Sequence, residues 1–93
     1  MVLGGQHNLV SGTTAVIAGG ALNVASGPYA GILAGYENVA SHNGAAVCGG
    51  RSNEAIQDGS AVLGGYNGSA GGLYSVVVGG TGGATTGTSE IYP

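Results

Sequence analysis

Few side chains in this sequence can do chemistry. It has two histidines, one cysteine, one aspartate and three glutamates. His7 and His42 stand at different positions of the repeat described below, and neither has a second ligand at the spacing of a metal site. Nothing in the sequence orients Asp58, the only aspartate, toward a histidine, so no Ser–His–Asp set can be argued. We therefore expect no catalytic site, no metal site and no cofactor, and we expect that the protein is not an enzyme.

Other candidate sites are equally incomplete. Glu54 and Asp58 are interpreted as solvated charges at a corner rather than as a catalytic pair. The glycine-rich run over residues 79–84 is similar to a calcium-binding repeat, but Ala84 stands where that repeat needs aspartate. The run also lacks the lysine of a phosphate loop. Four tyrosines are expected at surface corners, where they are suited to sugar or protein contact. These are Tyr29, Tyr36, Tyr66 and Tyr74.

Charge is nearly absent from the chain. Arg51 is the only basic residue and the formal net charge is −3. Nucleic-acid binding needs lysine and arginine to neutralise phosphates, and attraction to an anionic membrane surface needs the same residues. No apolar run of membrane-spanning length occurs. We expect neither a nucleic-acid partner nor membrane insertion.

A 15-residue repeat organises the whole sequence. Glycine recurs at Gly5, Gly20, Gly35, Gly50, Gly65 and Gly80, usually with a second glycine before it. Asparagine follows three residues later at Asn8, Asn23, Asn38 and Asn53. A β-branched column reads Val2, Ile17, Ile32, Val47, Val62 and Val77. The unit is too short for a helical repeat. We expect one domain over residues 1–93 with six repeats, the last degenerate from about residue 81.

The unit predicts two short strands joined by two glycine-bearing corners. The strands are expected at residues such as 8–11 and 15–18. One unit per coil makes an all-β parallel β-solenoid with two sheets. The asparagines should form a ladder that hydrogen-bonds from coil to coil and to the corner backbone. Corner glycines should supply backbone angles that other residues resist.

Alternation places the β-branched column inside the coil, opposite alanines. The columns on either side of it should point outward, yet they are almost wholly apolar. A strand apolar on both faces is normally buried on both faces, so we predict that this sheet packs against other copies of the chain. The predicted interface residues are Leu3, Val16, Ala18, Leu33, Ala46, Cys48, Ala61, Leu63, Val76 and Val78. The lone Cys48 is expected to be a buried free thiol.

The repeat resembles the YadA-like head repeats of trimeric autotransporter adhesins and the glycine-rich repeats of phage tail fibres. The likeness is carried by residues 15–27 (AVIAGGALNVASG) and 60–70 (SAVLGGYNGSA), and it extends over nearly the whole chain. It implies a left-handed roll, a homotrimer and a building block of a fibre, spike or adhesin head. Attachment to a host receptor or glycan, outside the cell, at a cell surface or on a virion, would follow. The unit here is one residue longer than is usual in the adhesins, and the neck, stalk and membrane anchor of that family are not seen.

Two other roles stay open from the sequence. Ice-binding solenoids use coils of similar length, but they present an outward threonine ladder. The counterparts of Thr13 and Thr14 in the next two coils are Pro28, Tyr29, Asn43 and Gly44. The first coil has no obvious cap, which favours a filament subunit that stacks end to end.

Overall fold

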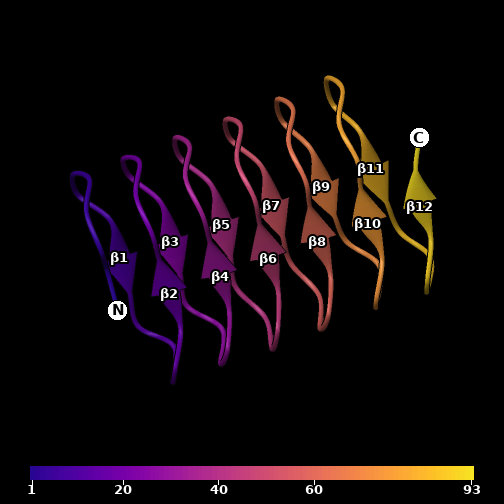
Figure 1. Ribbon diagram of the computed structural model, residues 1–93. Coiled ribbons are helices and arrows are strands. Elements are labelled where there is room, and N and C mark those ends of the chain that lie inside the picture. The colour runs from indigo at the N-terminus through magenta and orange to yellow at the C-terminus, as the bar shows by residue number, and fades with distance from the viewer.

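The computed structural model describes residues 1–93 and contains strands but no helix, so no segment forms a helix that could cross a membrane. Twelve strands of two residues each follow one another along the chain (Figure 1). The odd-numbered strands are β1 (Leu9–Val10), β3 (Val24–Ala25), β5 (Val39–Ala40), β7 (Glu54–Ala55), β9 (Ser69–Ala70) and β11 (Ala84–Thr85). The even-numbered strands are β2 (Val16–Ile17), β4 (Gly31–Ile32), β6 (Ala46–Val47), β8 (Ala61–Val62), β10 (Val76–Val77) and β12 (Ile91–Tyr92).

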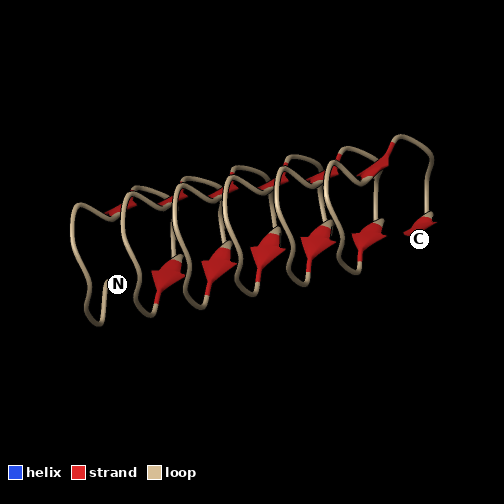
Figure 2. Cartoon of the chain, turned by 90° about the horizontal axis from the view of Figure 1, so that it is seen from above, coloured by secondary structure: helices blue, strands red, loops and turns tan.

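The strands form two parallel six-stranded sheets, one odd-numbered and one even-numbered. Each residue pairs with the residue 15 positions later, as in Val24 with Val39 and Ile32 with Val47. The coils therefore stack in line, with the two sheets facing each other across a thin interior (Figure 2). The Cα extents are 31 × 24 × 11 Å. The prediction of an all-β parallel solenoid with about six coils is confirmed.

The strands are shorter than the sequence predicts, two residues instead of four. Three positions of every unit have a positive φ, as Gly20, Leu22 and Tyr29 do in the second coil. The backbone turns at these positions and at the hydrogen-bonded turns between the strands, so the strands cannot extend further. A third ladder also appears, which the sequence interpretation did not include. It runs through isolated parallel bridges from Gln6 through Ala21, Tyr36, Arg51 and Tyr66 to Thr81.

The core is a single stack of small apolar layers. Ile17, Ile32, Val47, Val62 and Val77 point inward and are at most 1% exposed. Opposite them lie Ala25, Ala40, Ala55 and Ala70, all fully buried. A β-branched residue facing alanine fills a thin interior without a void, which explains the flattened shape of the coil. The inward direction predicted for both columns is confirmed from the second coil onward.

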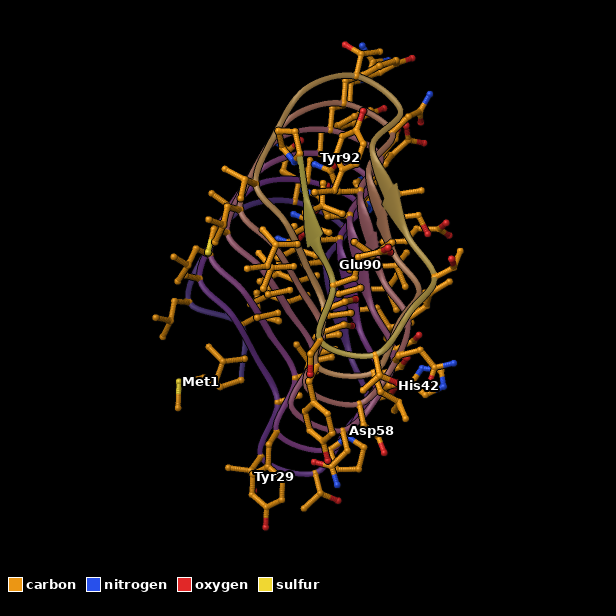
Figure 3. All side chains as sticks on the ribbon, turned by 90° about the vertical axis from the view of Figure 1, so that its right-hand side faces the viewer. Met1, Tyr29, His42, Asp58, Glu90 and Tyr92 are labelled. Carbon is orange, nitrogen blue, oxygen red and sulfur yellow. The ribbon has the colours of Figure 1, made fainter.

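The two ends of the flattened coil differ in construction. We call residues 4–8 and their equivalents the glycine-pair corner, and residues 11–14 and their equivalents the variable corner. At the variable corner a backbone turn closes each coil, as in the bond from the Ala30 amide to the Gly27 carbonyl (3.1 Å). Figure 3, viewed along the stack, shows Tyr29 and Asp58 at this end and Met1 on the even-numbered side.

The degenerate last unit keeps the register of the others. Strands β11 and β12 pair with β9 and β10, and Thr85 is buried where earlier units have alanine. The Thr85 hydroxyl bonds to the buried Ser75 hydroxyl (2.6 Å). Tyr92 occupies the column of the inward valines, and its ring lies against Gly83 (Figure 3). An aromatic ring therefore covers the core at this end of the stack.

Candidate functional site

The asparagines of the glycine-pair corner form a continuous ladder inside the coil. Asn23, Asn38 and Asn53 are fully buried. Each side-chain oxygen accepts a bond from the backbone amide 15 residues later, at 2.9 Å for Asn38 to the Asn53 amide. The ladder ends at Asn53, whose side-chain oxygen accepts a hydrogen bond from the Gly68 amide at 2.8 Å. Each coil is thus tied to the next by a side chain as well as by the sheets.

The amide nitrogen of each rung explains the glycine pair. Asn38 Nδ2 donates to the Ala34 carbonyl (3.3 Å) in its own coil and to the Gly50 carbonyl (3.1 Å) in the next. Asn23 and Asn53 repeat this pattern on their own coils. Both N–H donors of the Asn38 side chain and its oxygen therefore have partners within the corner, and no buried side-chain polar atom lacks a partner. The ladder is a structural device that leaves no side-chain group facing a ligand.

The second glycine of each pair has a geometric reason to be glycine. Its φ lies between 87° and 110°. A Cβ at Gly20, Gly35 or Gly50 would overlap both the carbonyl of the next coil and the asparagine amide. The first glycine of the pair has no such restriction, because a Cβ added there would have no atom within 4 Å at Gly19, Gly49, Gly64 and Gly79. One unit accordingly has alanine, Ala34, at this position.

The outward face of the even-numbered sheet carries the predicted interface residues. Leu3, Leu33, Leu63 and Val78 are exposed, with Leu33 at 61%. Val16, Ala18, Ala46, Cys48, Ala61 and Val76 lie half-buried between them. We name this surface the apolar face. The expectation that Cys48 is buried is wrong for a single chain, because its column points out of the coil.

The third ladder holds a cluster that sequence reasoning missed. The guanidinium carbon of Arg51 lies 5.3 Å from the ring centroid of Tyr36 and 5.8 Å from that of Tyr66. The single cation of the chain is therefore held between two tyrosine rings at an exposed position. The sequence contains a signal for the cluster, since these three residues are spaced by 15, but their column has no common residue type that would reveal it.

The remaining candidate residues are scattered over the surface. His42 and Asp58 are exposed at the variable corner (Figure 3). The His42 ring contacts the Ser41 hydroxyl at 3.1 Å, and Asp58 accepts a bond from the Asn43 amide at 3.2 Å. His7 is exposed at the glycine-pair corner, and Glu54 lies on the outer face of β7. The structure has no group of three metal-binding side chains and no pocket.

The apolar face and the tyrosine–arginine cluster are thus the two surfaces with a distinctive composition. Comparison with protein-family models, with curated proteins and with solved structures found no match to the chain. The arguments for a function therefore come from these two surfaces.

Proposed function

We propose that the protein is a structural building block whose solenoids assemble side by side through the apolar face, as a trimeric fibre, spike or adhesin head. The observation that carries this proposal is the uncharged outer surface of the even-numbered sheet. Its two outward columns hold no charged residue from the first coil to the last. A soluble protein rarely leaves a contiguous apolar surface of that length open to water.

The partner that fits the apolar face is a second copy of the same chain. Along one column large and small side chains alternate, from Leu3 through Ala18, Leu33 and Cys48 to Leu63. The neighbouring column is small in its three middle coils, at Gly31, Ala46 and Ala61, and Gly31 lies beside Leu33 in the same coil. The leucine side chains of one copy can pack against the small residues of another copy, so that the two surfaces interdigitate as side chains do in protein interiors. Close packing without cavities is what a stable interface requires.

This small chain has enough surface to form a specific interface between copies. A specific interface buries about 800 Å² on each partner. That is about a fifth of the 4479 Å² accessible surface of the single chain. An assembly would also supply the apolar burial that a 93-residue chain has little of alone. Three copies and left-handed coils follow the resemblance to adhesin heads, and attachment outside the cell or on a virion is part of the same proposal.

Solution mass tests the assembly directly. Light scattering behind a sizing column should give three times the 8.7 kDa chain mass. The double variant Leu33→Glu, Leu63→Glu should give a single chain, because burying a carboxylate in an apolar contact is strongly unfavourable. Leu9→Glu is the matched control: Leu9 is 57% exposed on the other sheet, close to the 61% of Leu33, and its column already holds Glu54.

Cys48 provides a second, independent measurement. It is the only cysteine and lies in the middle of the apolar face. A thiol reagent should label it slowly in the assembled protein and quickly in the glutamate double variant. A single-chain mass for the unmodified protein, with fast labelling, would eliminate the proposal. A much larger mass with filaments in electron micrographs would instead support end-to-end stacking.

The ice-binding role has less support than assembly. The column of Thr13 continues as Pro28, Asn43, Asp58 and Leu73, so no flat threonine ladder forms there. Absence of thermal hysteresis in the purified protein is the expected result.

A further inference from the structure

The cluster of Tyr36, Arg51 and Tyr66 occupies three successive rungs of one ladder. Their backbones are joined by parallel bridges, so the coil spacing fixes the distance between the side chains. The rungs on either side are Ala21 and Thr81, which are too small to cover the outer tyrosine faces. The guanidinium thus stacks between two rings that are 39% and 44% exposed. Each contact has the geometry of a cation–π interaction.

Stacking orders the arginine without using its hydrogen-bonding edge. The guanidinium carbon lies over both rings, and the N–H donors lie in the plane of the group, where they can reach a ligand. An arginine held in this way is preorganised for a carboxylate, which it can bind through two parallel hydrogen bonds. The two tyrosines on either side of it carry hydroxyls that can act as additional donors, and the polar residues Ser52 and Asn67 follow Arg51 and Tyr66 in the chain.

We propose that this cluster binds the carboxylate group of an acidic saccharide. The carboxylate would lie on the edge of Arg51, and the sugar hydroxyls would bond to the tyrosine hydroxyls and the neighbouring polar side chains. Tyrosine combines an apolar ring with a polar tip, which suits it to a ligand of this kind. The inference is independent of assembly through the apolar face, because the cluster belongs to one chain and lies at the glycine-pair corner.

A peptide ligand fits the same surface less well. Peptides are commonly captured by adding a strand to an open sheet edge or by filling a groove. The backbone at Tyr36, Arg51 and Tyr66 is already bridged on both sides, so no edge is open there. The surface also has no pocket for an anchoring side chain. Recognition must come from side-chain donors on a flat surface, which matches a chain of hydroxyl groups and a carboxylate.

The test is a titration of the ¹⁵N-labelled full chain, followed by NMR. The probe is an oligosaccharide of glucuronate and N-acetylglucosamine, and its methyl ester is the neutral comparison. We expect the acid to shift the Arg51 Nε–H signal and the backbone amides of the cluster, and the ester to shift neither. Arg51→Gln should weaken binding by about tenfold or more, as expected for a charge-assisted hydrogen bond.

Further variants separate recognition from stability. Arg51→Lys keeps the charge but loses the planar donor pair, so it should also bind less tightly. Tyr36→Phe keeps the stack but removes a hydroxyl, with a smaller loss. Tyr74→Phe is the matched control, since Tyr74 is an exposed tyrosine of the variable corner, and it should bind as the unmodified chain does. Glu37→Gln removes a negative charge next to Tyr36 and should strengthen binding slightly.

Four outcomes would overturn the proposal. The first is equal binding of acid and ester, and the second is unchanged binding by Arg51→Gln. The third is stronger binding of a glutamate-rich peptide than of the saccharide, which would assign the cluster to a protein partner. A sulfated oligosaccharide that binds more tightly than the carboxylate, with loss in Arg51→Gln, would contradict the choice of carboxylate.

Discussion

The glycine-pair corner and the variable corner close the same coil in opposite ways. At the glycine-pair corner every unit has glycine at the second position of the pair, and four of the six have the asparagine, which is fully buried in three of them. At the variable corner no two units share the same four residues: compare SGTT at 11–14 with IQDG at 56–59. Both corners nevertheless keep a spacing of 15 residues in every coil.

The difference lies in where the hydrogen bonds come from. The glycine-pair corner has backbone bonds between coils, such as the Leu22 amide to the Gln6 carbonyl (3.1 Å), and in addition the bonds of a side chain inside the coil. That side chain demands one residue type and leaves no room for a Cβ beside it. The variable corner is held by bonds between backbone groups, such as the Tyr74 amide to the Asp58 carbonyl (3.0 Å). Backbone bonds place few demands on side chains, so that corner tolerates different sequences.

The largest expected effect comes from a methyl group on the second glycine. Gly50→Ala should destabilise the fold by about 3 kcal/mol or more, because it combines a strained positive φ with an overlap on the Gly65 carbonyl and the Asn53 amide. Urea denaturation followed by circular dichroism measures the loss.

Two alanine substitutions sharpen this result. In Gly49→Ala, at the first glycine of the pair, the added Cβ has no atom within 4 Å, so the free energy of unfolding should change by less than about 0.5 kcal/mol. Gly80→Ala has a φ of 96° but no neighbour within 4 Å, so it isolates the cost of the backbone angle, about 1 kcal/mol. Equal losses at positions 49 and 50 would contradict the account of the corner.

Removal of one asparagine rung should have the next largest effect. Asn38→Ala leaves the Asn53 amide and the Ala34 carbonyl without their side-chain partner in a buried corner. We expect a loss of about 2–3 kcal/mol in the free energy of unfolding. Asn43→Ala is the control at the variable corner, where the exposed side chain has no such role, and its effect should be under about 0.5 kcal/mol.

The smallest expected effect is an increase in stability caused by a substitution at the variable corner. Thr14 has a φ of 58°, a conformation that β-branched residues resist and asparagine tolerates. The equivalent position holds Gly44 and Gly59 in other coils. Thr14→Asn should therefore stabilise the chain by about 0.5–1 kcal/mol, seen as a rise in Tm. Thr13→Asn, whose φ is not positive, should bring no gain, and a gain there would show that backbone strain is not the cause.

The sequence predicts the stack well because its period is visible in residues whose role is internal. Ile17, Asn23 and Gly20 recur at fixed intervals since each must fit the copy above and below it. The inward columns, the parallel register and the number of coils follow from that recurrence. The positive φ values at Thr14, Leu22 and Tyr29 could not be predicted, because backbone bonding imposes them on residues of any type.

The arginine cluster shows a second limit of the sequence. Tyr36, Arg51 and Tyr66 belong to a column that has no common residue type, since its other members are Gln6, Ala21 and Thr81. A search for repeated residues does not find the cluster, although the spacing of 15 places its three members on one ladder. The buried hydroxyls of Ser60 and Ser75 were missed for a similar reason. They replace alanine at the end of the variable corner, where each bonds across its own turn (Ser60 Oγ to the Gln57 carbonyl, 2.7 Å).

The uniform register has a consequence for the evolution of length. Every coil pairs with the coils before and after it in the same register, so a whole extra unit can be inserted while the strand register on both sides of it is kept. Tandem duplication or loss of 15 codons would then change the rod in steps of about 4.8 Å, the distance between neighbouring strands. The length of an array of this kind can therefore change in whole coils while its two sheets and their register are preserved.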